Sequence, residues 1–100
     1  VPDALRNLWH NTECYVNLMI DYTSNFHKIG ISNNPEYREQ TLLSQKPTIE
    51  LIVSKKSITT KIAASFEKAL HTAYADKRVR GEWFQLNAQE LFEIKFTLEN

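Results

Sequence analysis

The sequence predicts an α+β fold in which a small antiparallel sheet, built from a hairpin and a third strand, is flanked by helices. Two neighbouring segments, 13–22 and 26–32, alternate apolar and polar residues with period two, as strands do when one face is buried. The turn-forming sequence Thr-Ser-Asn at 23–25 separates them. Helical patterns with capping signals follow. A chain of 100 residues is the size of a single domain.

The predicted hairpin has two distinct faces, because successive side chains of a strand point in opposite directions. The apolar face, which we expect to pack against the core, carries Cys14, Val16, Leu18, Ile20, His27, Ile29 and Ile31. The opposite face carries Tyr15, Asn17, Met19, Asp21, Lys28, Gly30 and Ser32. Ahead of the hairpin, residues 2–10 could form a short helix that begins at Pro2.

A helix and the third strand come next. The helix is expected over 33–45, where an asparagine cap precedes Pro35 at the first helical position, and Pro47 ends the segment. The strand is expected over 48–56. Three apolar residues of this strand are predicted to share one face, namely Ile49, Leu51 and Val53.

The longest helical pattern covers 58–77, and a short strand at 82–86 follows Gly81. The final helix is expected over 87–99, because Asn87 followed by Glu90 is a capping-box arrangement. The core stripe of the long helix is predicted to be Ile62, Phe66, Leu70 and Ala73.

Composition restricts the function classes. The net charge is zero with a pI near 7.0, which argues against tight, autonomous binding of nucleic acid but not against a catalytic domain that is delivered to its substrate. The lone Cys14 excludes an intramolecular disulfide and, with only three histidines, gives no zinc-ligand spacing. No segment resembles a membrane span or a signal peptide, so we expect an intracellular protein. The start at Val1 suggests a domain from a longer protein.

One side of the hairpin could form the floor of a site for an anionic ligand. Tyr15 and Lys28 are predicted to lie side by side there, with Asn17 and Ser32 nearby. Gly30 is one of only two glycines, and a glycine inside a strand usually marks a close approach by a ligand or another backbone. The alternative is an ordinary solvated sheet face.

Other candidate residues lie on the helices. Arg38 falls in the first turn of a helix, where the helix dipole disfavours a cation, so it is either a site residue or a surface arginine. Glu67 and His71 follow Ala63 at helical spacing beside the core, which suits a metal ligand or a plain boundary pair. A basic patch or a solvated loop is expected at Lys77, Arg78 and Arg80.

Together these segments resemble a GIY-YIG nuclease domain, in the phage-type branch where the second half-motif reads KIG and a GEWF segment closes the domain. The resemblance rests on CYV at 14–16, KIGIS at 28–32, Arg38, FEKALH at 66–71 and GEWFQL at 81–86. It covers about residues 13–86, which we take as the core of one domain spanning 1–100.

The resemblance implies a role for each matching residue. Tyr15 would activate or orient the attacking water, Lys28 stands in place of the second tyrosine, and Gly30 matches the glycine that lets a phosphodiester lie against the sheet. Arg38 would contact the scissile phosphate, and Glu67 would hold one divalent metal, Mg²⁺ or Mn²⁺. The family's histidine one helical turn after the arginine and its later asparagine lack clear counterparts. His27 and His71 are therefore candidates for the base, and His71 is the better one because it lies one turn from Glu67.

The expected function is therefore that of a metal-dependent DNA endonuclease of phage or mobile-element type, targeted by another domain or partner protein. The expected substrate-binding residues are Asn17, Gly30, Ser32, Lys77, Arg78 and Arg80. Two alternatives remain open. The domain could be a nucleic-acid-binding module whose active site has decayed, or a protein-interaction domain that docks a partner through its aromatic residues.

Overall fold

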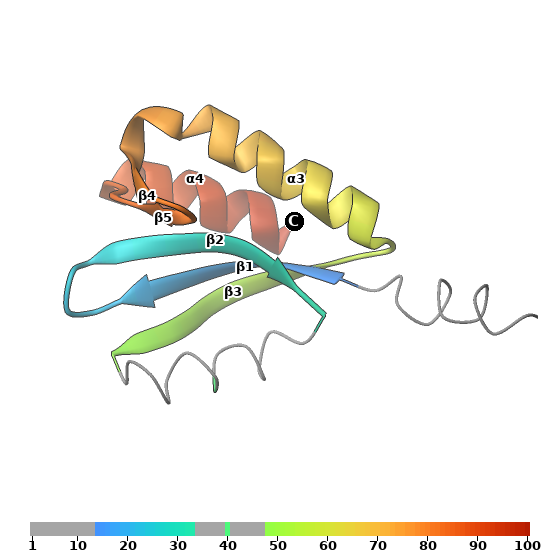
Figure 1. Ribbon diagram of the computed structural model, residues 1–100, viewed down its shortest axis with the longest axis horizontal. Coiled ribbons are helices and arrows are strands. Elements are labelled where there is room, and N and C mark those ends of the chain that lie inside the picture. The colour runs from blue at the N-terminus through green and yellow to red at the C-terminus, as the bar shows by residue number, and fades with distance from the viewer. Residues whose placement is uncertain (1–13, 34–39, 41–47) are drawn as a thin grey trace, which may run out of the picture.

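In the described part of the chain, two helices cover one face of a five-stranded antiparallel sheet (Figure 1). The computed structural model describes residues 14–33, 40 and 48–100. The strand order is β3-β1-β2-β5-β4. The strands are β1 (Cys14–Asp21), β2 (Phe26–Ser32), β3 (Ile49–Ser57), β4 (Arg78–Arg80) and β5 (Trp83–Phe84), and the helices are α3 (Thr60–Ala73), a 3₁₀ turn (Ala75–Lys77) and α4 (Ala88–Glu99). The predicted α+β class is confirmed.

The β1–β2 hairpin forms as predicted. Its register pairs Tyr15 with Ser32 and continues to Asp21 opposite Phe26. In the turn, Asn25 has a φ of 61°, a left-handed conformation that asparagine tolerates better than most residues. The turn is closed by the Asn25 N–H, which donates to the Asp21 carbonyl over 2.7 Å. The hairpin is therefore specified locally, by strand alternation and turn chemistry.

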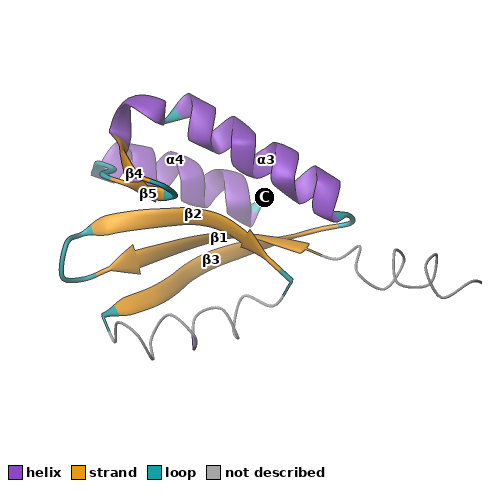
Figure 2. Cartoon of the chain, in the orientation of Figure 1, coloured by secondary structure: helices purple, strands orange, loops and turns teal. Residues whose placement is uncertain are grey.

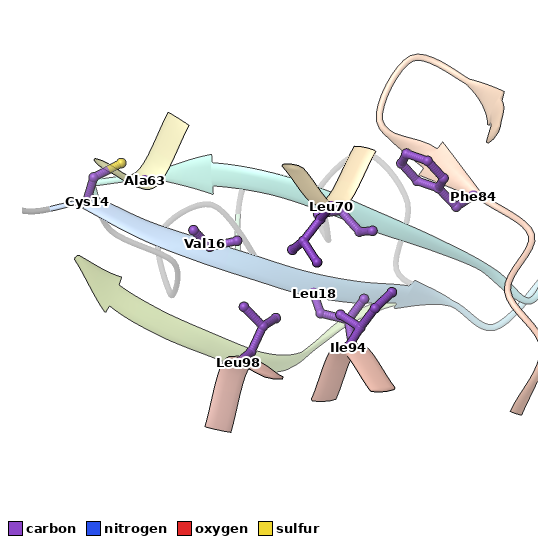
Figure 3. Close-up of a cluster of buried hydrophobic side chains, with 9 residues drawn as sticks. Cys14, Val16, Leu18, Ala63, Leu70, Phe84, Ile94 and Leu98 are labelled. Atoms are coloured by element: carbon purple, nitrogen blue, oxygen red, sulfur yellow. The ribbon is translucent and has the colours of Figure 1, made fainter. Parts of the chain in front are cut away.

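The hydrophobic core lies between the sheet and the two helices (Figures 2 and 3). Its buried residues come from both strands of the hairpin, from β5 and from both helices: Cys14, Val16, Leu18, Ile29, Ala63, Leu70, Phe84, Ile94 and Leu98. Burying one large aliphatic side chain contributes about 1.5–3 kcal/mol, so this cluster is the main stabilising element.

The core stripe of α3 differs from the prediction at two of its four positions, while Phe66 and Leu70 pack at the core as predicted. Ala63 is fully buried and Leu70 nearly so, whereas Ile62 is 50% exposed and Ala73 is exposed. Ala63 has no side chain beyond Cβ, so the helix can approach the sheet closely at that point. As a result Glu67, one turn further along, lies at the border of the core.

A bulge in β3 overturns the prediction that Ile49, Leu51 and Val53 share a face. The register shifts between Leu18 and Met19, so that Val53 pairs with Leu18 but Leu51 pairs with Met19. Because a bulge inserts one extra residue, side-chain alternation changes phase across it. Val53 therefore packs against the core, while Ile49 and Leu51 belong to the other face.

The second face of β1 is more buried than a solvated face would be. Asn17, Met19 and Asp21 are only 3%, 2% and 2% exposed. The Asp21 carboxylate accepts hydrogen bonds from the Thr48 hydroxyl (2.7 Å) and the Thr23 N–H (3.0 Å). The expected half-buried strand is thus a strand buried on both faces.

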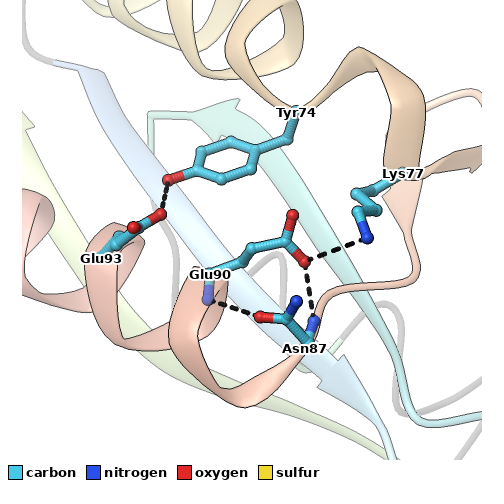
Figure 4. A network of polar contacts seen from close by, with 5 residues as sticks. All are labelled: Tyr74, Lys77, Asn87, Glu90 and Glu93. Carbon is cyan, nitrogen blue, oxygen red and sulfur yellow. Dashed lines mark hydrogen bonds and ion pairs between the residues drawn. The ribbon is translucent and has the colours of Figure 1, made fainter.

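A polar network joins α4 to the end of α3 (Figure 4). The predicted capping box is present, with the Asn87 side chain accepting from the Glu90 N–H and the Glu90 carboxylate accepting from the Asn87 N–H. Lys77 lies 3.7 Å from the same Glu90 carboxylate, and the Tyr74 hydroxyl donates to Glu93. These contacts fix where α4 begins relative to the 3₁₀ turn.

The segment between the helices was only partly predicted. The short strand expected at 82–86 is present as β5, but β4 was not expected, and the long helix ends at Ala73 rather than at residue 77. Gly81 allows the tight turn between β4 and β5, because it adopts a φ of +52°.

Some expectations fall outside the described residues. They include the helix at 2–10, Arg38, and most of the helix at 33–45, of which only Asn33, in a bend, and Gln40, which is helical, are described. Within the ranges that are described, no helix has both the length and the apolar character needed to cross a bilayer.

Candidate active site

The candidate site forms along the outer edge of β2, where β5 stops pairing. The β2–β5 ladder includes only His27 and Lys28 of β2. Beyond it, the Ile29 N–H donates to the Glu82 carbonyl over 3.0 Å, and the Ile29 carbonyl accepts from His71 over 2.7 Å. The next backbone N–H on this edge, that of Ile31, donates to the Glu67 carboxylate. The side chains of His71 and Glu67 on α3 thus form hydrogen bonds to backbone groups of β2 that a neighbouring strand would otherwise pair with.

Glu67 lies half-buried on this edge in an electrostatic setting that favours a cation. Its pKa is raised, first by burial and then by the negative charge of Glu82. Three other interactions lower this pKa: the charge of His71, the hydrogen bond from the Ile31 N–H and the charge of Lys28. A partly dry carboxylate close to a second carboxylate is stabilised when a positive ion binds to it.

His71 uses both of its ring nitrogens in hydrogen bonds. A carbonyl can only accept, so Nε2 carries the proton that is donated to Ile29. A guanidinium can only donate, so Nδ1 accepts from Arg78 over 3.0 Å. The ring also contacts Phe84 edge-on, with 4.9 Å between centroids. This arrangement holds the imidazole in one tautomer and suits a positioning role better than that of a base.

Gly30 provides space for a protein carboxylate. A Cβ atom at this position would overlap Oε2 of Glu82 and would lie 3.8 Å from Cε of Lys28. The sequence predicted a close approach at Gly30, and the group that makes this approach is Glu82. Sequence reasoning had not placed Glu82 in the site, although the GEWF segment that contains it was part of the resemblance.

The predicted site face is assembled, but its members are spaced differently from the expectation. Tyr15 lies opposite Ser32, Asn17 opposite Gly30, and Met19 opposite Lys28. Tyr15 and Lys28 are therefore not neighbours: four residues of strand, roughly 13 Å, separate their positions along β1. The Lys28 ammonium lies instead 5.8 Å from the centroid of the Trp83 ring.

Asn17 lies at the middle of this face and is almost fully buried. Its amide nitrogen donates to the Ser32 hydroxyl over 2.8 Å, while Oδ1 has no hydrogen-bond partner. The amide borders a cavity of about 10 Å³, roughly the room for one water molecule, together with Met19, Lys28, Gly30, Ile31 and Glu82. The cavity is therefore small and polar, with an unsatisfied acceptor in its wall.

A comparison with known protein families matches residues 14–99 to the T5orf172 domain. The chain belongs to the T5orf172 family. This family is phage-associated and related to GIY-YIG and other nuclease-like folds, which supports a nuclease-like or nucleic-acid-associated module. Comparisons with curated proteins and with solved structures gave no match.

The three basic residues predicted to form one patch in this T5orf172 domain have separate roles. Lys77 pairs with Glu90 of α4. Arg78 holds His71 and lies over the Phe84 ring, 5.5 Å from its centroid. Arg80 is exposed in β4. Arg78 also borders an open groove of about 580 Å³ along α3, whose other lining residues are Ala64, Glu67, Lys68, His71, Thr72 and Ala75.

The donor set of the T5orf172 domain suits a hard cation. Within the described residues, no group of three or more His, Cys, Asp or Glu side chains converges as metal ligands. Mg²⁺ commonly binds through one or two carboxylates, with water and substrate phosphate oxygens completing the shell. Glu67 fits that pattern, because it is fixed by the Ile31 N–H and lies beside the open α3 groove.

Proposed function

We propose that this T5orf172 domain is a metal-dependent endonuclease of GIY-YIG type that hydrolyses phosphodiester bonds in DNA. The placement of Glu67 supports this most strongly. The sequence resemblance assigns the metal to Glu67. Its carboxylate accepts a hydrogen bond from the Ile31 N–H on the β2 edge, and the charges of Lys28 and Glu82 both affect its pKa. A carboxylate whose pKa is raised by burial and by a second carboxylate, at the border of an open groove, is typical of functional sites.

Each site residue would contribute a different part of phosphodiester hydrolysis. Tyr15 orients the attacking water and takes its proton, while Lys28 and Arg38 stabilise negative charge on the phosphate oxygens. A divalent ion, when bound at Glu67, would polarise the phosphate and stabilise the departing alkoxide. His71 holds the edge of the site in place through its bond to the Ile29 carbonyl.

Negative charge develops on the phosphate oxygens and on the leaving group during hydrolysis, so fixed positive groups lower the barrier. Lys28 would supply such a charge: its side chain lies beside Gly30, and its ammonium lies 5.8 Å from the centroid of the Trp83 ring. Arg38 is assigned by resemblance, since it lies outside the described residues.

A plasmid assay tests the proposal. The purified domain is incubated with supercoiled plasmid at low salt, with Mg²⁺ or Mn²⁺, and parallel reactions contain excess EDTA. We expect nicked or linear product that depends on the divalent ion. If the folded domain shifts plasmid mobility but leaves every strand intact with both ions, it is a binding module and the endonuclease proposal fails.

A further inference from the structure

Glu82 is built into the candidate site by its backbone on both sides. Gly81 makes the preceding turn, the Glu82 carbonyl accepts from the Ile29 N–H over 3.0 Å, and Trp83 pairs with Lys28. The side chain then lies against Gly30, in space that any larger residue would fill. A carboxylate fixed in this way is not a freely moving surface group.

One buried oxygen in the wall of the cavity beside Glu82, Oδ1 of Asn17, has no hydrogen-bond partner. Asn17 lies directly opposite Gly30, and both line the same small cavity as Glu82. Asn17 is 3% exposed and its Oδ1 accepts no hydrogen bond. A buried, unpaired acceptor costs on the order of 1–3 kcal/mol, which a bound cation or one of its waters would offset.

A second observation links this cavity to Glu67. The Glu82 carboxylate lies against Gly30, and the Glu67 carboxylate accepts a hydrogen bond from the N–H of the next residue, Ile31, which lines the same cavity. The negative charge of Glu82 raises the pKa of Glu67, which agrees with this placement. Two carboxylates together neutralise a divalent ion, and an amide oxygen is a suitable additional donor for a hard cation or its hydration shell. The two acidic residues belong to different elements, α3 and the β4–β5 turn, and both lie along the outer edge of β2.

We propose that Glu82 is a second carboxylate ligand for the divalent cation of this site, acting with Glu67, and that the Asn17 amide oxygen holds one of the cation's water molecules. This inference rests on the proposed function, because it extends the same metal site. It also gives Gly30 a specific reason to be glycine: a side chain there would push the Glu82 carboxylate away.

Cation binding without DNA tests the inference separately from catalysis. Mn²⁺ is titrated into the whole domain and followed by the EPR signal of the free ion. We expect Glu82→Gln and Gly30→Ala each to weaken Mn²⁺ binding about tenfold or more, the first by removing charge and the second by displacing the carboxylate. Glu99→Gln, on the exposed end of α4, is the matched control and should bind as the wild type does. Thermal melts verify that each variant is folded.

Several outcomes would overturn the inference. The inference fails if the wild type shows no saturable Mn²⁺ binding, or if Glu82→Gln binds Mn²⁺ normally while Glu67→Gln does not. Normal Mn²⁺ binding together with tighter DNA binding by Glu82→Gln would instead identify Glu82 as an anionic occupant of the phosphate position. If the wild type binds Mn²⁺ and Glu82→Gln does not, yet plasmid remains intact, the cation site stands and the endonuclease proposal fails.

Discussion

The candidates for the group that takes the proton from the attacking water were Tyr15, His71 and, less well placed, His27. His71 donates from Nε2 to the Ile29 carbonyl and accepts at Nδ1 from Arg78, so neither nitrogen is left for a water molecule. Tyr15 lies on the site face opposite Ser32 and is half-buried. At the residue scale the geometry therefore favours Tyr15 as the base and His71 as a positioning group.

Removing the Tyr15 hydroxyl should nearly abolish cleavage. We expect Tyr15→Phe to retain less than about a tenth of wild-type activity at every pH, because general-base assistance typically contributes about 10²–10⁴-fold. The measurement is the initial rate of plasmid nicking across a pH series. Tyr22→Phe is the control, since that exposed tyrosine lies beyond the far end of β1 and bonds to Glu50. A Tyr15→Phe enzyme with near-normal rates would exclude the phenol as the base.

His27 should make the fold less stable in mild acid. It is 5% exposed, neither ring nitrogen has a hydrogen-bond partner, and burial lowers its pKa below 6.5. As the pH falls through 6.5 toward the lower folded-state value, the unfolded chain binds a proton that the native chain does not. The contribution of His27 to the free energy of unfolding is therefore fully present above about pH 6.5, and it decreases as the pH falls below that value.

The variant His27→Phe removes this titration. Urea unfolding at pH 7.5 and 5.5 should show a smaller difference in the free energy of unfolding for His27→Phe than for the wild type. Equal differences in the two proteins would show that His27 does not contribute to the acid sensitivity.

At the scale of elements, local signals were predictable and contacts between distant segments were not. The hairpin register and the capping box at Asn87 follow from alternation and from residues close in sequence. The bulge in β3 and the strand β4 depend on how the chain packs against partners far away in sequence. Glu82 was missed for the same reason, because only the folded chain brings it to Gly30.

The α4 capping box offers a test at this scale. Asn87→Ala removes the acceptor of the Glu90 N–H, and the loss of such a cap costs about 1 kcal/mol. The expected fall in the thermal midpoint is roughly 4–8 °C for a domain of this size. Gln89→Ala, an exposed change in the first turn of the same helix, should leave the midpoint nearly unchanged. Equal midpoints for Asn87→Ala and wild type would mean that tertiary packing alone determines the start of α4.

At the scale of the whole molecule, charge limits how the domain reaches DNA. The net charge is zero, and within the described residues Lys77 is already paired with Glu90 and Arg78 with His71. Few phosphates can then be neutralised. A targeting segment or partner protein is the expected means of delivery to a particular site.

The salt dependence of DNA binding measures how many phosphates the domain neutralises. We expect weak binding of the isolated domain to DNA, with a slope of log affinity against log salt that corresponds to roughly three to five phosphate contacts. Fluorescence anisotropy with a labelled duplex at several salt concentrations gives the slope. Nanomolar affinity at physiological salt with a steep slope would show that the domain finds DNA without help.

The most direct test of the central claim is the single-turnover rate of DNA cleavage by Glu67→Gln in saturating Mg²⁺. The substitution keeps the size of the side chain and removes the charge that holds a divalent ion. Glu99→Gln, which removes one carboxylate from an exposed site on α4, controls for the change in net charge. The account predicts a rate at least about a hundredfold below wild type for Glu67→Gln and an unchanged rate for Glu99→Gln. A folded Glu67→Gln protein that cleaves at the wild-type rate would contradict it.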